Sequence, residues 1–207
     1  MCKSEPTQMK GLAELLTLQR MRVLLDTNIL IQGADARCLE QRKAIQDFCK
    51  QNEVCICDTV FYEFLRNCSP EKFRRRMRQV ESWSRKTGMM PVLPENEKIP
   101  RTFESLWILF LSVMRADPKR LIHLNKEDLW IAAAAAGHGI DHILTTDHSG
   151  DYPPEAFDDR SFDISMEKSH LVLHLKTFKR NWAREQWKTL MKAGSANIDI
   201  RSFFFGH

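Results

Sequence analysis

Four acidic residues stand at the end of a predicted strand or within a predicted helix, and their types point to metal chemistry. Asp26 directly follows the apolar run at 22–25, and Asp147 closes the segment HILTTD. Glu63 lies in TVFYEFLRN, and Asp128 lies near the start of KEDLWIAAAAA. Two carboxylates about 5 Å apart repel by roughly 3 kcal/mol at an effective dielectric of about 20, so a cluster of them needs a neutralising partner. Hard divalent cations such as Mg²⁺ or Mn²⁺ prefer such oxygen ligands.

A divalent ion in such a cluster would support hydrolysis at phosphorus. Metal-bound water can act as a nucleophile at neutral pH, and the ion stabilises the charge that builds up during an in-line displacement. We therefore expect Asp26, Asp128 and Asp147 to be metal ligands. Glu63 is expected to be a further ligand or to orient the attacking water.

Each acid also has an ordinary structural explanation. Asp26 could cap the turn after its strand, and Asp128 could be favoured by the dipole of the helix that it opens. Glu63 could pair with Arg66, and Asp147 could be a turn residue. Taken one at a time, these explanations are favoured for every acid except Asp26. They weaken when the four acids are taken together, because four independent caps need not arrive at one place.

Strands and helices alternate along most of the chain. Strands are expected at 22–25, 54–57, 142–145 and 171–175, and helices at 7–20, 37–50, 59–67, 70–87, 101–115, 126–136 and near the end of the chain. The segment 148–160 is expected to be a polar loop. Connections that contain helices join parallel strands, so the pattern predicts an α/β fold with a central, mostly parallel sheet flanked by helices and with a C-terminal helical extension. Ligands lie beyond the carboxyl ends of the strands in such sheets, so we expect the four acids at that edge.

The length of 207 residues suits one domain with extensions. We divide the chain into an N-terminal helical extension at 1–20, a central α/β domain at 21–176, and a C-terminal basic helix and tail at 177–207. No apolar run approaches the roughly 20 residues that cross a bilayer, and the first ten residues lack the apolar core of a secretion signal. A cytoplasmic protein without membrane contact is therefore expected. The six cysteines form no CxxC pair, which favours free thiols.

The formal net charge is only +4, but basic residues cluster in two predicted helices. In the helix at 70–87 an apolar stripe of Phe73, Met77 and Val80 predicts that the remaining surface carries Arg74, Arg75, Arg76 and Arg78. The second basic helix lies near the C-terminus. Either helix could be merely a solvated face or could contact a polyanion. Arg74, Arg75 and Arg78 are the candidate phosphate contacts.

The segments LLDTNILI, VFYEFLRN, EDLWIAAAAAG and ILTTD, in this order, resemble the four signature segments of PIN-domain ribonucleases, particularly the VapC-like toxins of bacterial toxin–antitoxin pairs. The resemblance spans about residues 22–152. It implies a sheet of parallel strands flanked by helices, a divalent metal, and cleavage of single-stranded RNA that leaves a 5′-phosphate and a 3′-hydroxyl. By position, the residues that match the acidic quartet of the family are Asp26, Glu63, Asp128 and Asp147.

The resemblance also implies supporting residues, and the chain departs from the family pattern after the last acid. Thr27 and Asn28 match the polar pair that supports the first ligand, and Thr146 resembles the hydroxyl residue before the last one. Family members commonly carry a second acid two residues after the T-x-D aspartate. Here Asp151 is the candidate for that acid, displaced by an insertion, so the fourth ligand is either Asp147 or Asp151.

The resemblance therefore implies a metal-dependent endoribonuclease that acts on RNA with Mg²⁺ or Mn²⁺ as cofactor. The expected role is that of the toxin, with a cognate antitoxin protein as partner. The terminal extensions leave contacts with RNA, a partner protein or a second copy in a homodimer open. A housekeeping RNA-processing nuclease and a non-catalytic RNA-binding module stay as alternatives. A phosphotransferase of the haloacid dehalogenase type is disfavoured, because Asn28 stands where that type has a second aspartate.

Overall fold

The computed structural model describes residues 14–15, 17, 21–35, 39–66, 68–87, 92–116, 125–147, 152–166 and 169–192. Side chains are described in these ranges except at 79–87, 115–116, 165–166 and 169. The helix predicted at 7–20 falls almost entirely outside the described residues.

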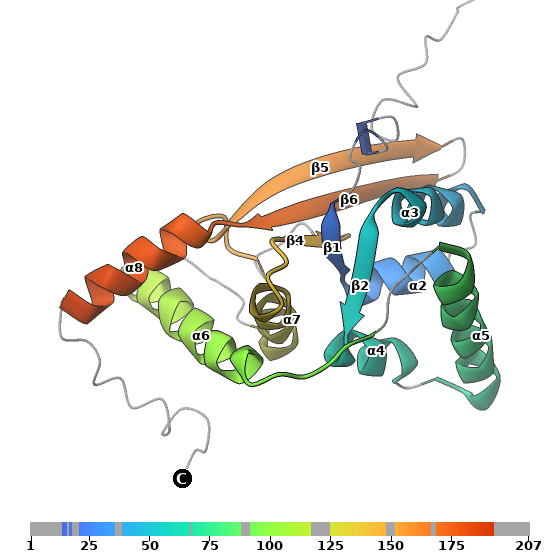
Figure 1. Ribbon diagram of the computed structural model, residues 1–207. Coiled ribbons are helices and arrows are strands. Elements are labelled where there is room, and N and C mark those ends of the chain that lie inside the picture. The colour runs from blue at the N-terminus through green and yellow to red at the C-terminus, as the bar shows by residue number, and fades with distance from the viewer. Residues whose placement is uncertain are drawn as a thin grey trace, which may run out of the picture.

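Six strands form one sheet in the described part of the chain, in the order β3-β2-β1-β4-β6-β5 (Figure 1). Their bounds are β1 (Arg22–Leu25), β2 (Glu53–Cys57), β3 (Val92–Leu93), β4 (His142–Thr145), β5 (Phe157–Met166) and β6 (Ser169–Phe178). β1 pairs in parallel with β2 and β4, and β3 pairs in parallel with β2. β6 is antiparallel to β4 and to β5. The predicted α/β fold with a central, mostly parallel sheet is confirmed.

The helices between and beyond these strands lie close to the predicted ranges. Their bounds are α2 (Thr27–Asp35), α3 (Leu39–Gln51), α4 (Asp58–Leu65), α5 (Pro70–Thr87), α6 (Lys98–Ala116), α7 (Lys126–Gly137) and α8 (Arg180–Lys192). Asn125 caps α7 as its sequence predicts, because its side chain accepts a hydrogen bond from the amide of Glu127. The chain leaves α7 through Gly139, whose φ of 72° favours glycine.

Three local predictions were wrong. The N-cap of α4 is Cys57, which makes no side-chain cap hydrogen bond, and the expected cap Asp58 is the first helical residue. α2 was not predicted, although it begins directly after Asp26. The first part of β5 was predicted as loop. Only one face of this strand is buried, with residues such as Phe162 and Ile164, and most of its other residues are polar. β6 (Ser169–Phe178) also extends beyond the strand that was expected at 171–175.

The parallel strands bring three chain segments to one edge of the sheet. Asp26 follows the end of β1, α4 follows the end of β2, and Thr146 follows the end of β4. α7 is antiparallel to β4, because only the short segment 138–141 joins them. The N-terminal turn of α7 therefore lies toward the same edge. We call this the carboxyl edge. β6 is antiparallel to β4 and ends beside its first residues, so α8 begins at the opposite edge.

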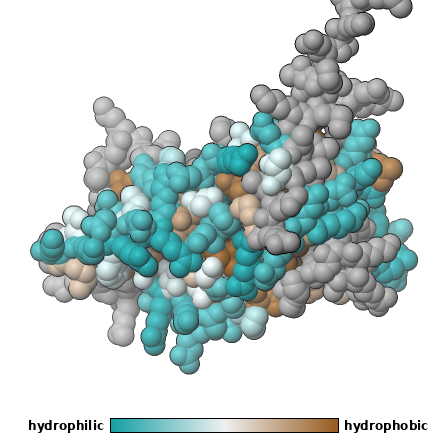
Figure 2. Space-filling view, turned by 45° about the horizontal axis from the view of Figure 1, so that its top comes forward, coloured by the Kyte–Doolittle hydropathy of each residue, from teal (hydrophilic) through white to brown (hydrophobic). Residues whose placement is uncertain are grey.

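The core and the surface have the character of an ordinary globular domain. The largest fully buried side chains include Phe48, Phe64 and Phe110. On the face that Figure 2 shows, hydrophilic residues cover most of the described surface. Within the described residues, no helix combines the length and the apolar character needed to cross a membrane.

The described cysteines are free thiols, as the sequence predicts. Cys49, Cys55 and Cys57 are buried, and Cys68 is partly buried. Burial raises the pKa of Cys49 and Cys55 to about 12. These thiols therefore behave as small apolar side chains rather than as nucleophiles.

α5 packs with a different face from the one predicted. Arg76 is only 4% exposed, whereas Phe73 is 43% exposed, so the predicted distribution of the arginines was wrong for Arg76. The Arg76 guanidinium donates to the carbonyl of Phe64, in the last turn of α4, and to the sulfur of Cys68 at 3.2 Å. Its Cζ also lies 4.7 Å from the centroid of the Phe64 ring. A cation is favourable at a helix C-terminus, where carbonyl groups lack helical partners.

Replacing Arg76 with methionine is expected to lower the free energy of unfolding by about 2–3 kcal/mol, because the Phe64 carbonyl loses its donor and the cation–π contact is lost. Urea unfolding measures the difference. Arg74→Met on the exposed side of the same helix is the control and should change stability by less than about 0.5 kcal/mol. Equal effects of the two substitutions would show that Arg76 does not fasten α5 to α4.

Candidate active site

Asp26 is the buried centre of the carboxyl edge. Its backbone N–H donates to the carbonyl of Leu144 at 2.9 Å, which continues the pairing of β1 with β4. Its own carbonyl accepts from the amides of Ile29 and Leu30, so Asp26 also begins α2. The structural explanation of Asp26 as a cap is therefore correct for its backbone. It does not account for the carboxylate, because the residue is only 4% exposed.

Three neighbours hold the Asp26 carboxylate in place. Oδ1 accepts from the backbone N–H of Thr27 at 2.6 Å. Oδ2 accepts from the hydroxyl of Thr145 at 2.7 Å and from the side-chain amide of Asn28 at 3.0 Å. Both carboxylate oxygens are thus hydrogen-bonded, which fixes the orientation of the group in a buried position.

Thr145 and Asn28 connect the ends of β1 and β4. The Thr145 hydroxyl donates to Asp26 and accepts from the Asn28 amide at 2.9 Å and from the backbone N–H of Asp147 at 3.0 Å. These three bonds use its full capacity. The Asn28 carbonyl oxygen accepts from the backbone N–H of Thr146 at 2.9 Å. The segment that carries Asp147 is therefore attached to the supports of Asp26.

Glu63 joins this group from α4. Its Oε2 accepts a hydrogen bond from the hydroxyl of Thr27 at 2.5 Å. Thr27 therefore contacts both acids, through its backbone N–H to Asp26 and through its hydroxyl to Glu63. The negative charge of Glu63 acts on Asp26 strongly enough to raise its pKa. The structure thus brings together carboxylates that lie 37 positions apart in the sequence.

Burial, with a smaller contribution from the charge of Glu63, raises the pKa of Asp26 to about 6. The hydrogen bonds from Thr145, from the amide of Thr27 and from Asn28 act in the opposite direction. Desolvation outweighs these bonds, so the ionised carboxylate lacks a sufficient positive partner among its protein neighbours.

The donor set fits a hard divalent cation in its chemistry. Mg²⁺ is commonly held by only one or two carboxylates, and water and substrate phosphate complete its coordination. Asp26 and Glu63 supply such a pair, and Thr27 donates hydrogen bonds to oxygens of both. No group of three or more His, Cys, Asp or Glu side chains in the described residues is close enough to hold one ion. The structure therefore assembles two members of the predicted quartet at one point.

The other predicted site residues have different positions. Asp128 is partly buried in the first turn of α7, and Asp147 is partly buried just after β4. Both belong to segments of the carboxyl edge, but neither carboxylate completes a three-residue metal group with Asp26 and Glu63. Asp151 lies outside the described residues.

The three expected supporting residues lie around Asp26 in different ways. Thr27 and Asn28 both contact Asp26. The hydroxyl that supports the carboxylate belongs to Thr145 rather than to the predicted Thr146, which contributes its backbone N–H. The two-residue period of an extended chain is the signal that the sequence offered, because it places Thr145 on the same side as Asp147.

A second buried polar cluster lies beyond Thr145 on the sheet. His174 of β6 is the register partner of Thr145, and its Nδ1 lies 3.1 Å from both carboxylate oxygens of Asp159. The buried ammonium of Lys176 donates to Asp159 at 2.8 Å. Burial alone would raise the pKa of Asp159, but Lys176 and His174 hold it below its usual value. This cluster contains its own counter-charges, whereas among the described residues no cationic side chain contributes to the pKa shift of Asp26.

Asp26→Asn is expected to change how stability depends on pH in the metal-free protein. The folded-state pKa of Asp26 is raised, so its ionisation costs stability as pH increases from the ordinary value of 3.8 to about 6. Between about pH 7.5 and about pH 4.5, wild-type protein should therefore gain roughly 2 kcal/mol relative to Asp26→Asn. Urea unfolding in the presence of a chelator at both pH values measures this difference. Asp158→Asn, which replaces an exposed carboxylate, is the control. If the stability difference between wild type and Asp26→Asn is the same at both pH values, the Asp26 carboxylate does not have the raised pKa of a buried acid.

Comparison with known proteins agrees with this geometry. The family model of the PIN domain matches residues 23–149. No curated protein and no solved structure gives a significant match. The matched range covers β1 to β4 and includes Asp26, Glu63, Asp128 and Asp147. Because this range is more than half of the chain, the protein belongs to the PIN-domain family, whose members are generally nucleases.

Proposed function

We propose that this protein is a metal-dependent endoribonuclease that hydrolyses phosphodiester bonds in single-stranded RNA. The observation that supports the proposal most strongly is the buried Asp26 carboxylate beside Glu63, with Thr27 hydrogen-bonded to both. Members of the family are generally nucleases. That the substrate is RNA and that cleavage requires a metal are proposals that go further than family membership.

The side chains have distinct proposed roles. Asp26 and Glu63 would hold Mg²⁺ or Mn²⁺, and Asp128, Asp147 and Asp151 are the further candidate ligands. When bound, the ion supplies a water activated for attack and positive charge beside the phosphorus.

The residues around the pair control its geometry. Thr145 and Asn28 orient the Asp26 carboxylate, and Thr27 orients Glu63. Such supporting bonds fix the ligands before an ion binds, which lowers the cost of binding.

The RNA backbone would be contacted from α5. Arg74, Arg75 and Arg78 are exposed on this helix, and Arg76 fastens the helix to the end of α4. α4 carries Glu63, so the exposed arginines stand on the neighbour of a site helix. Guanidinium groups bind phosphate through paired donors, which suits them to this role.

Cleavage of a labelled single-stranded RNA should require Mg²⁺ or Mn²⁺ and should stop with a chelator. Asp26→Asn and Glu63→Gln are each expected to slow cleavage by more than about 100-fold, because they remove charge that would hold the ion. Thr145→Val is expected to slow it by roughly 10–100-fold through loss of ligand orientation. Asp158→Asn, remote from the carboxyl edge, is the control. Cleavage that persists in chelator or in both acid variants would end the metal-nuclease proposal, and binding without cleavage would favour a non-catalytic RNA-binding module.

We further propose that the nuclease is the toxin of a toxin–antitoxin pair, with a cognate antitoxin protein as partner. The support is the resemblance of the four sequence segments to VapC-like toxins. Expression of the chain without an antitoxin should arrest bacterial growth, because uncontrolled RNA cleavage stops protein synthesis, and Asp26→Asn should relieve the arrest. Normal growth with an enzyme that is active in the purified state would instead favour a housekeeping RNA-processing nuclease.

A further inference from the structure

Two aromatic side chains are exposed on the helices next to the acidic pair. Tyr62 of α4 is 67% exposed, and Phe73 of α5 is 43% exposed. Tyr62 directly precedes Glu63, so it shares a helical turn with a residue of the candidate active site. Large exposed aromatics in a globular domain call for an explanation when they lie beside a site.

Packing of the core does not explain the exposure of Phe73. Burying a phenylalanine side chain would stabilise the fold by about 1.5–3 kcal/mol. α5 instead buries Arg76, which lies three positions further along the helix, and leaves Phe73 at the surface. Places where the hydrophobic pattern is broken in this way are often functional.

Tyr62 and Phe73 stand on two helices that the Arg76 side chain connects. Arg76 of α5 donates a hydrogen bond to the carbonyl of Phe64, and its guanidinium lies over the Phe64 ring. Tyr62 lies two positions before Phe64 on α4, and Phe73 lies about one turn before Arg76 on α5. The short segment 66–69 joins the two helices, and they lie next to each other in Figure 1.

Positive charge accompanies these aromatics. Arg74, Arg75 and Arg78 are exposed on α5. Proteins bind single-stranded nucleic acid by combining cations that track the backbone with aromatic rings on which unpaired bases stack. A paired duplex buries the faces of its bases, so this combination favours unpaired strands. The chemistry of the surface therefore matches a single-stranded nucleic acid, and the proposed function makes single-stranded RNA the candidate.

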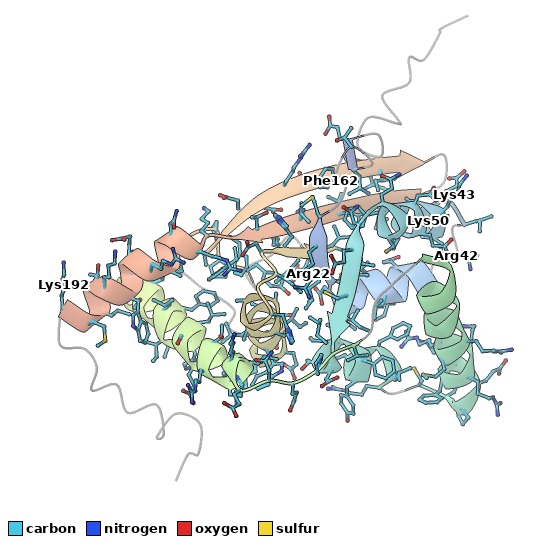
Figure 3. All side chains as sticks on the ribbon, in the orientation of Figure 1. Arg22, Arg42, Lys43, Lys50, Phe162 and Lys192 are labelled. Atoms are coloured by element: carbon cyan, nitrogen blue, oxygen red, sulfur yellow. The ribbon has the colours of Figure 1, made fainter. Side chains whose placement is uncertain are left out.

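α8 offers a comparable composition in a different place. Trp187 is 38% exposed on this basic helix. α8 begins at the edge of the sheet opposite Asp26, and Lys192 marks its outer end, far from α5 (Figure 3). α8 is therefore the matched control surface rather than the candidate.

We propose that Tyr62 and Phe73, together with Arg74, Arg75 and Arg78, form a stacking surface that binds unpaired RNA bases and leads the strand to the acidic pair. This inference rests on the proposed ribonuclease function and adds to it the residues that select single-stranded substrate.

Binding of a fluorescent 12-nucleotide single-stranded RNA, measured by anisotropy in chelator to prevent cleavage, tests the proposal. Tyr62→Ala and Phe73→Ala should each weaken binding by roughly 5- to 100-fold, because each removes a stacking ring. Tyr62→Phe, which keeps the ring, should bind like wild type, and Trp187→Ala on α8 should have no effect. Arg74→Ala should reduce the dependence of binding on salt, whereas Tyr62→Ala should leave that dependence unchanged.

A strand of the same length without bases separates stacking from backbone contacts. Tyr62→Ala and wild type should bind this abasic strand equally weakly. The stacking surface is contradicted if Tyr62→Ala and Phe73→Ala bind the normal RNA as tightly as Trp187→Ala does, if they weaken binding of both strands alike, or if wild type binds no RNA.

Cleavage assays with Mg²⁺ distinguish the two levels of the proposal. Wild-type cleavage together with unimpaired cleavage and binding by the aromatic variants would overturn the stacking surface alone. Absence of metal-dependent cleavage in wild type would overturn the ribonuclease function itself.

Discussion

The structure around the carboxyl edge depends on the burial of one carboxylate at the end of β1. Asp26 has little contact with solvent, and its hydrogen bonds do not fully compensate for desolvation. Its partners come from α2 and from the end of β4, so the position of this side chain requires β1 and β4 to be aligned. The fold thereby holds an acid in a place where its charge is costly, which is typical of functional sites.

The same carboxylate organises the neighbouring helices. Thr27 donates hydrogen bonds to both Asp26 and Glu63 and thus fixes α4 relative to β1. Arg76 binds the carbonyl of Phe64, the residue after Glu63 on α4, and fixes α5. A short series of contacts therefore runs from the end of β1 to the exposed arginines of α5, and the proposed RNA surface is positioned by the same elements that position the acids.

The sequence predicted the parts of the site that strong local patterns and topology determine. The apolar runs of β1 and β4 were found with their bounds, and parallel topology alone placed Asp26 and Glu63 at one edge. The sequence did not determine which side chains point at one another. Whether Thr145 or Thr146 supports Asp26 depends on the direction of side chains at a strand end. Likewise, the burial of Arg76 depends on the carbonyl that α4 presents to it, which no pattern within α5 reveals.

Crystals grown with Mn²⁺ and examined by anomalous scattering test the central claim most directly. The account expects an anomalous peak coordinated by the carboxylates of Asp26 and Glu63, and loss of that peak in Asp26→Asn crystals. A map at saturating Mn²⁺ that shows no peak at this pair, or a peak there that survives the substitution, would contradict it.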